Sequence, residues 1–144
     1  MNIAIGSDHR GLDFKKQVTE ILAEMGYQCQ DFGTYTANSV DYPDIARVVC
    51  EAVAASRFDY GVLICGTGIG MSIAANKIKG IRAALCCDIF GAQRARMHND
   101  ANVICLGAER GESGLKDILK TFFNTRFEGG RHLRRLEKIR GMEG

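Results

Sequence analysis

The sequence predicts an α/β fold in which a five-stranded parallel sheet lies between two layers of helices. Five short apolar segments alternate with segments whose apolar residues recur at helical spacing. Strands that alternate with helices pair in parallel, because each helix returns the chain to the same end of the sheet. The 144 residues, 46% hydrophobic and 25% charged, suffice for the core of one domain spanning residues 1–144.

Local signals place the elements in chain order. Asp8 and Asp88 are good N-caps, Pro43 favours the first turn of a helix, and Gly26 favours a helix end. Strands are predicted at residues 1–6, 27–32, 60–64, 80–87 and 101–106. Helices are predicted at residues 11–25, 43–56, 88–97, 115–123 and 131–139, and from the glycine turn that follows the third strand to about residue 77.

The stretch Cys65-Gly-Thr-Gly-Ile-Gly70 joins the third strand to a helix. A glycine-rich turn before a helix directs several backbone N–H groups to one place, so it favours a bound anion or a negative charge that develops during a reaction. A dinucleotide fingerprint would need glycine where Met71 stands, and no Lys-Ser/Thr pair follows the glycines as a P-loop requires.

Cys65 ends the third predicted strand, where α/β proteins place their ligands. N–H groups around its sulfur would stabilise negative charge there, which favours a chemical role over simple burial. The ends of the other strands carry Asp8 and His9, Asp88, and the loop after Leu106, and we expect His98 to join this rim. Asp8 with His9, and His98 with its neighbours, are candidates for proton transfer to a sugar hydroxyl, although helix capping explains them equally.

The basic residues are concentrated near the C-terminus, with six of the 19 Lys and Arg from Arg126 onward. Arg131 and Arg135 share a helix face, an arrangement suited to a phosphate group. A single short basic segment is not typical of a nucleic-acid surface. Three scattered histidines without ligand spacing do not predict a metal site.

The composition indicates a cytoplasmic protein. No apolar run approaches the roughly 20 residues of a membrane span, and the N-terminus lacks the features of a signal peptide. The six cysteines form no C-x-x-C pair, so we expect them to be reduced.

Taken together, these motifs resemble the ribose-5-phosphate isomerase type B family, which also includes galactose-6-phosphate isomerase subunits. The matching stretches follow the family's order over nearly the whole chain: Gly6-Ser-Asp-His-Arg-Gly11, Asp41-Tyr-Pro43, residues 61–77, Gly80-Ile-Arg-Ala83, His98-Asn-Asp-Ala-Asn-Val103 and Glu128-Gly-Gly-Arg-His132. The resemblance implies a Rossmann-like three-layer α/β/α fold and a homodimer, alone or as half of a dimer of dimers, with active sites at the interface. It implies no metal or other cofactor.

The reaction implied is the aldose–ketose isomerisation of D-ribose 5-phosphate and D-ribulose 5-phosphate, a step of the pentose phosphate pathway. By resemblance, Cys65 is the base that moves a proton between C1 and C2, and Thr67 assists proton movement between the two oxygens. His98, with Asp8, helps to open the furanose ring. The enediolate is held by the backbone of the turn, which comprises Gly66, Gly68, Ile69 and Gly70.

The resemblance also implies the groups that bind the rest of the substrate. The phosphate is held by His9, Arg131 and Arg135, and the sugar contacts Asn99. The helix from about residue 131 is expected to contribute to the site and to the dimer. One departure concerns the loop after the fifth strand, where Glu109 stands in the place of the family's phosphate-binding arginine and Arg110 follows it. Arg110 takes over that role if the loop rearranges; otherwise the phosphate contact is weaker or the preferred sugar phosphate differs.

Three alternatives remain open. An isomerase for a six-carbon sugar phosphate, such as allose 6-phosphate or galactose 6-phosphate, would use the same mechanism. A sugar-phosphate sensor would bind without turnover, and a nucleotide-binding module would use the glycine turn alone. The set Asp8, Cys65, Thr67 and His98 argues against the sensor and the nucleotide module, since binding by itself needs no base.

Overall fold

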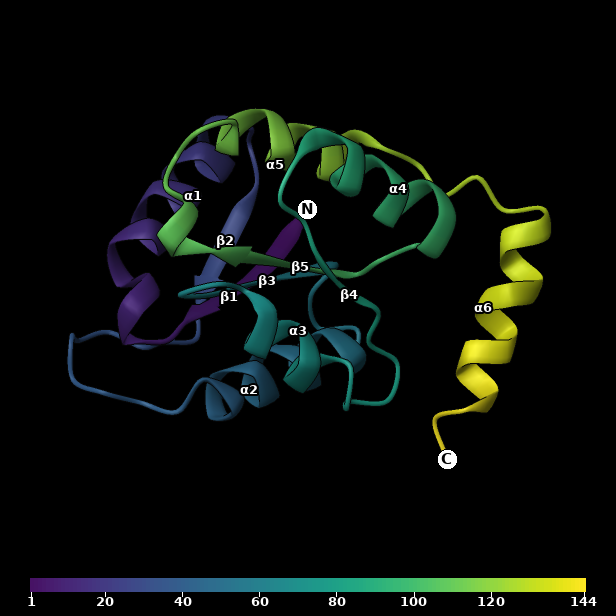
Figure 1. Ribbon diagram of the computed structural model, residues 1–144, viewed down its shortest axis with the longest axis horizontal. Coiled ribbons are helices and arrows are strands. Elements are labelled where there is room, and N and C mark those ends of the chain that lie inside the picture. The colour runs from purple at the N-terminus through teal and green to yellow at the C-terminus, as the bar shows by residue number, and fades with distance from the viewer.

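A five-stranded parallel sheet organises the chain, and its strand order is β2-β1-β3-β5-β4. The structure, a computed structural model, describes residues 1–144. The strands are β1 (Asn2–Ser7), β2 (Gln28–Asp31), β3 (Tyr60–Cys65), β4 (Ala83–Leu85) and β5 (Val103–Gly107). The prediction of a three-layer α/β fold with five parallel strands is confirmed (Figure 1).

Helices cover both faces of the sheet. One face carries α1 (Leu12–Glu24), α4 (Ile89–Asn99) and α5 (Leu115–Asn124), and the other carries α2 (Tyr42–Ala54) and α3 (Ile69–Ala75) (Figure 1). Two short 3₁₀ helices, η1 (His9–Gly11) and η2 (Ala108–Arg110), follow β1 and β5. Successive strand residues point to opposite faces, so Val62 and Ile64 pack under α1, α4 and α5 whereas Leu63 and Cys65 pack under α2 and α3.

Two predicted boundaries were too long. The fourth strand covers only residues 83–85, because it is an edge strand that pairs with β5 alone. The residues before it are bound by a side chain instead of a strand. Asn102 Oδ1 accepts from the Arg82 N–H, and Asn102 Nδ2 donates to the Gly80 carbonyl. Helix α3 ends at Ala75, because the Asn76 side chain donates to the Ser72 and Ala83 carbonyls and accepts from the Ala83 N–H.

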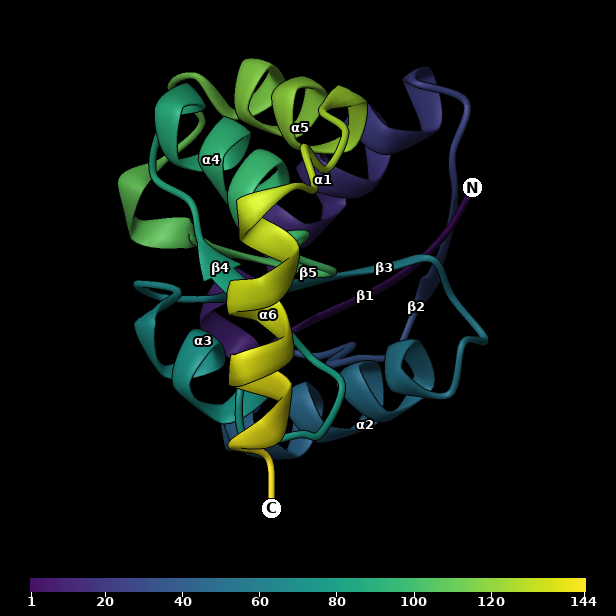
Figure 2. The ribbon, with the colours of Figure 1, turned by 90° about the vertical axis from the view of Figure 1, so that its right-hand side faces the viewer.

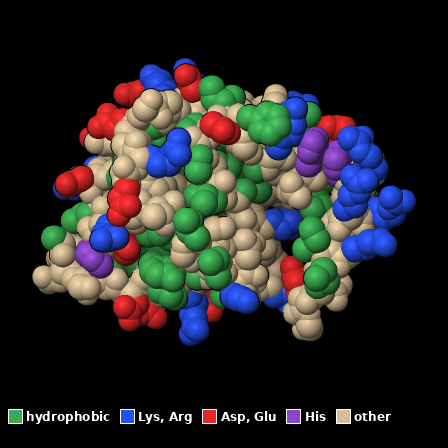
Figure 3. Space-filling view, in the orientation of Figure 1, with side chains coloured by type: hydrophobic (Ala, Val, Ile, Leu, Met, Phe, Trp, Pro, Cys, Tyr) green, Lys and Arg blue, Asp and Glu red, His purple; other side chains and the backbone are tan.

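The last helix, α6 (Arg131–Gly141), stands apart from both layers. It crosses the end of the sheet where the strands begin, and it reaches from the side of α4 towards the side of α3 (Figures 1 and 2). Leu136 is buried against the body, but Leu133, Ile139 and Met142 are 49%, 43% and 83% exposed. A cavity of about 480 Å³ separates α6 from the body (Figure 3). The helix therefore leaves much apolar surface uncovered in one chain.

Candidate active site

The strand order creates a crevice at the carboxyl ends of β1 and β3. These strands are neighbours, but the chain leaves β1 towards β2 and leaves β3 towards the opposite half of the sheet. Ligands of open α/β sheets bind where the connections diverge in this way. A pocket of about 400 Å³ lies there, and its lining residues are Asp8, Arg10, Tyr42, Cys65, Gly66, Thr67, Ile69, Gly70 and Ile73.

Cys65 is the last residue of β3 and lines this pocket. It is only 5% exposed, because α2 and α3 pack against it. Its Sγ accepts a hydrogen bond from the Gly68 N–H at 3.2 Å. The loop turns so that the Gly68 N–H reaches the sulfur, and Gly68 there adopts the left-handed region with φ 79°. Glycine adopts this conformation without steric cost. The sulfur is therefore positioned by its own loop.

Further N–H groups of the glycine loop are free to bind a ligand. The backbone N–H groups of Gly66, Thr67 and Gly70 have no acceptor within the chain, whereas the Ile69 N–H donates to Thr67 Oγ1 at 3.2 Å. Three unpaired donors beside a thiol match the predicted anion site, because each gains energy from a negatively charged acceptor. Thr67 itself is exposed, so its hydroxyl is accessible to a ligand.

Asp8 lies on the neighbouring strand end. Its N–H donates to the Ile64 carbonyl at 3.1 Å, which places it beside Cys65. Asp8 Oδ1 accepts from the N–H groups of Arg10 and Gly11, so Asp8 is a helix cap as predicted, although the element it caps is η1, and the residue is 5% exposed. His9 follows it. Its Nδ1 accepts from the Val40 N–H at 3.2 Å, an arrangement that leaves Nε2 to carry the proton of the neutral ring.

The loop after β5 packs on the glycine loop. The Glu109 N–H donates to the Gly66 carbonyl at 2.9 Å, and Glu109 Oε1 lies 3.1 Å from Arg10 Nη1. Arg110 donates instead to the Cys87 carbonyl at 3.3 Å and is not part of the pocket lining. Sequence reasoning did not select Arg10 or Tyr42, although each belongs to a motif that it did select.

The remaining predicted residues lie elsewhere in the chain. His98 ends α4 and stacks on His132 of α6, with ring centroids 4.2 Å apart and planes inclined by 16°. Glu128 Oε1 lies 3.9 Å from His132 Nε2 and 3.7 Å from Arg131 Nη1. Burial, together with the neighbouring His98 and the Arg131 guanidinium, lowers the pKa of His132. His132 is buried, and its Nε2 has no hydrogen-bond partner.

This second cluster contains side chains that can bind a metal ion. One ligand atom from each of His98, Glu128 and His132 lies within 4.8 Å of the others. The expectation of no metal site rests on the small number of histidines, their separation along the sequence and the lack of ligand spacing. The fold removes the second of these reasons, because it brings two of the three histidines together.

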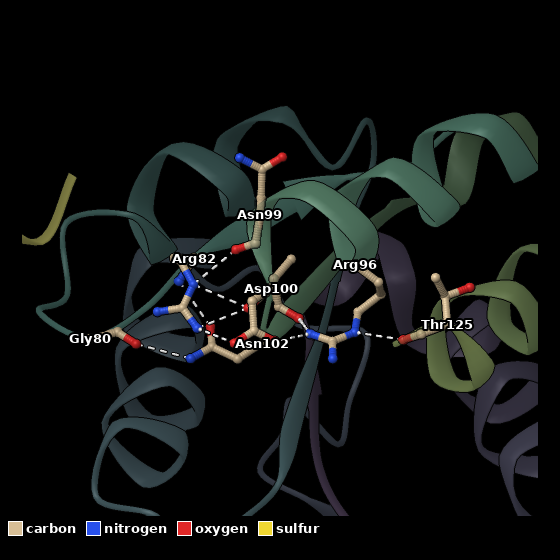
Figure 4. Close-up of polar contacts among 8 residues, drawn as sticks. Gly80, Arg82, Arg96, Asn99, Asp100, Asn102 and Thr125 are labelled. Atoms are coloured by element: carbon tan, nitrogen blue, oxygen red, sulfur yellow. Dashed lines mark hydrogen bonds and ion pairs between the residues drawn. The ribbon is translucent and has the colours of Figure 1, made fainter. Parts of the chain in front are cut away.

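A polar network holds the turn after His98. The Arg82 guanidinium donates to the carbonyls of Asn99 and Asp100, and the Arg96 guanidinium donates to Asp100 Oδ1 at 2.8 Å (Figure 4). Asp100 adopts φ 45°, which ends the helix. The amide of Asn99 points away from this network (Figure 4) and is exposed. The network therefore fixes the backbone and leaves the Asn99 amide free.

The placement of His98 on the same rim as Cys65 was wrong for a single chain. Helix α4 runs antiparallel to the strands, so its last residues lie at the amino ends: the Arg96 guanidinium is 5.0 Å from the Tyr60 ring at the start of β3. Tyr60 and Cys65 are five residue steps apart on β3, about 16 Å at 3.3 Å per residue. Arg131 and Arg135, exposed on α6, share the far end with His98, and histidine side chains are visible at both ends of the molecule (Figure 3).

Comparison with known proteins agrees with this architecture. The family description "Ribose/Galactose Isomerase" matches residues 3–139. The chain belongs to the ribose/galactose isomerase family. It is 44% identical to ribose-5-phosphate isomerase B of Escherichia coli, over 98% of this chain and 95% of that one. It is 42% identical to D-erythrulose-4-phosphate isomerase of Pectobacterium atrosepticum, over 96% and 93%.

Solved structures of family members share the whole fold. The structure of Clostridium thermocellum ribose-5-phosphate isomerase B superposes with a TM-score of 0.97 at 47% identity and covers 99% of this chain and 97% of that one. The family assignment made from the motifs, and with it the prediction of an isomerase, is confirmed. No helix here has the length and apolar character needed to cross a bilayer.

Proposed function

We propose that this protein interconverts D-ribose 5-phosphate and D-ribulose 5-phosphate, as a cytoplasmic enzyme of the pentose phosphate pathway. The observation that carries the proposal is the Cys65 thiol in a pocket beside three unpaired N–H groups. Family members named for this reaction align along almost the whole chain. Fixed donors next to a potential base suit a reaction in which an anion appears only as the substrate reacts.

The proton transfers are assigned to the two residues in the pocket. The Cys65 thiolate removes the C2 proton of the open-chain aldose, and the C1 carbonyl oxygen gains the negative charge. Thr67 passes the O2 proton to O1, and the Cys65 thiol then delivers its proton to C1, which leaves a ketone at C2. The N–H groups of Gly66 to Gly70 stabilise the enediolate between these steps. A positioned acid or base of this kind contributes about 10²–10⁴-fold in rate.

A second copy of the chain completes the site. Cys65 and His98 lie at opposite ends of the sheet, so one chain cannot bring both to one sugar. In a homodimer, α4 and α6 of one chain face the Cys65 pocket of the other, and the exposed apolar residues of α6 contribute to the interface. His98 then opens the furanose ring with Asp8, Asn99 contacts the sugar, and Arg131 and Arg135 join His9 at the phosphate. In this pairing the C-terminal helix α6 of the single domain belongs both to the active site and to the dimer interface.

The decisive assay is turnover of ribose 5-phosphate by the purified protein in EDTA, beside allose 6-phosphate, galactose 6-phosphate and erythrose 4-phosphate. Erythrose 4-phosphate cannot close a furanose ring, since its C4 oxygen carries the phosphate. We expect Cys65→Ala to lose activity on every substrate that wild type accepts. We expect His98→Asn to lose activity on ribose 5-phosphate and to retain it on erythrose 4-phosphate.

Mixing the two inactive variants tests the shared site. A heterodimer of Cys65→Ala with His98→Asn contains one site in which both residues are native. Random reassortment should therefore restore about a quarter of wild-type activity, because half of the dimers are hybrids with one good site of two. Absence of recovery in verified hybrids would refute the shared site and remove His98 from the mechanism. Turnover of a six-carbon substrate alone would mean that the same mechanism acts on a different sugar phosphate. Binding without turnover would indicate a sensor.

A further inference from the structure

Arg10 is the one basic side chain that lines the Cys65 pocket. It belongs to η1, directly after Asp8 and His9, and its backbone N–H donates to Asp8 Oδ1 at 3.0 Å. The base of this side chain is therefore fixed beside β1. Its guanidinium is free to adjust, since the side chain is 63% exposed.

The guanidinium lies over Gly66, the residue after Cys65. A Cβ at Gly66 would stand 3.1 Å from Arg10 Nη1 and 3.3 Å from Arg10 Cδ. The absence of a side chain at Gly66 thus leaves the space that Arg10 occupies. This places a permanent positive charge at the exposed edge of the pocket, beside Glu109.

Glu109 is the counter-ion of Arg10. Its Oε1 accepts from Arg10 Nη1 at 3.1 Å, and its backbone is tied to the Gly66 carbonyl. Arg10 and Glu109 are 99 residues apart in sequence, and their exposed side chains meet at the edge of the pocket. An exposed ion pair contributes little stability. A phosphate dianion can therefore displace the Glu109 carboxylate from the Arg10 guanidinium, or bind the guanidinium beside it.

We propose that Arg10 binds the phosphate of the substrate in this protein, and that Glu109 holds Arg10 in place when the pocket is empty. This inference rests on the proposed function, because it needs a phosphorylated sugar at Cys65. A guanidinium offers several donors in a plane, and Glu109 engages only Nη1, so Nε and Nη2 remain for phosphate oxygens. Arg110 does not compete for this role in the structure, since it is bonded to the Cys87 carbonyl.

Steady-state kinetics of Arg10→Ala, Glu109→Gln and the double variant test the proposal. Arg10→Ala should raise KM for ribose 5-phosphate roughly 10–100-fold, the value of a charged hydrogen bond, with kcat changed much less. Glu109→Gln should lower KM, because it removes a charge that repels the phosphate. The double variant should bind better than Arg10→Ala alone, because no unpaired carboxylate is left.

Two comparisons make the test specific. With unphosphorylated D-ribose, Arg10→Ala and wild type should have the same kcat/KM, and Arg110→Ala should raise KM for ribose 5-phosphate less than Arg10→Ala does. An unchanged KM in Arg10→Ala, an equal loss with D-ribose, or a larger effect of Arg110→Ala would overturn the proposal.

A binding measurement separates this proposal from the proposed function. Inorganic phosphate should raise the melting temperature of wild type more than that of Arg10→Ala. This result would support Arg10 as an anion ligand even if wild type turned over no sugar phosphate, an outcome that would refute the proposed function alone. Equal stabilisation of both proteins would overturn the assignment of Arg10.

Discussion

Gly68→Ala tests whether the glycine loop depends on a missing side chain. Gly68 has φ 79°, and a Cβ there would stand 2.6 Å from Leu85 Cδ1 and 2.9 Å from the carbonyl carbon of Leu106. The left-handed backbone costs an alanine about 1–2 kcal/mol. Overlap with the backbone of β5 adds about 1–3 kcal/mol, since the Leu106 carbonyl carbon, unlike a side-chain atom, cannot rotate away.

The expected loss of unfolding free energy is therefore about 2–5 kcal/mol. For a chain of 144 residues, each kcal/mol lowers the melting temperature by roughly 3 °C, so we expect a decrease of roughly 6–15 °C. Thermal and urea denaturation measure both values. Catalytic activity should fall as well, because the Gly68 N–H donates to Cys65 Sγ.

Gly26→Ala is the matched control. Gly26 has φ 85°, but no atom lies within 4 Å of the place of its Cβ. This variant carries only the backbone cost of about 1–2 kcal/mol, and kcat should be unchanged. If Gly68→Ala were no less stable than Gly26→Ala, the close approach of the loop to β5 would have no energetic consequence.

Two further predictions concern charge. Because the folded state lowers the pKa of His132 below its ordinary value of 6.5, the unfolded chain binds a proton more readily, and the stability of the wild type should fall as the pH drops below about 6.5. His132→Phe can still stack on His98 and should flatten that dependence; an unchanged slope in urea titrations at several pH values would contradict it. Lys15→Met should cost about 1.5–3 kcal/mol, since the buried Lys15 ammonium donates to Asp31 Oδ1 at 2.8 Å and to the Thr34 carbonyl. The exposed Lys16→Met is the control, and equal urea midpoints for the two variants would show that the buried ammonium contributes nothing.

Local sequence signals were sufficient for most elements. Alternation of apolar segments predicted the five strands, the glycine turn predicted the loop at Cys65, and Asp8 predicted a cap. Strands, turns and caps each depend on residues that are close together in the sequence. Their periodicity and hydrogen-bonding capacity can therefore be read from the chain itself. Strand β4 was predicted too long because apolar character cannot show that a strand lies at an edge.

Local patterns in the chain were enough to assign the fold class and the family, and they predicted a loop at Cys65 that is rich in N–H donors. Which residues lie close together in space became visible only in the folded chain. The antiparallel direction of α4 moves His98 to the far end of the sheet from Cys65, and the packing of η2 on the glycine loop brings Glu109 to Arg10. Such placements depend on strand order and on the path of each connection through space, and residues that are distant in sequence carry no local mark of them.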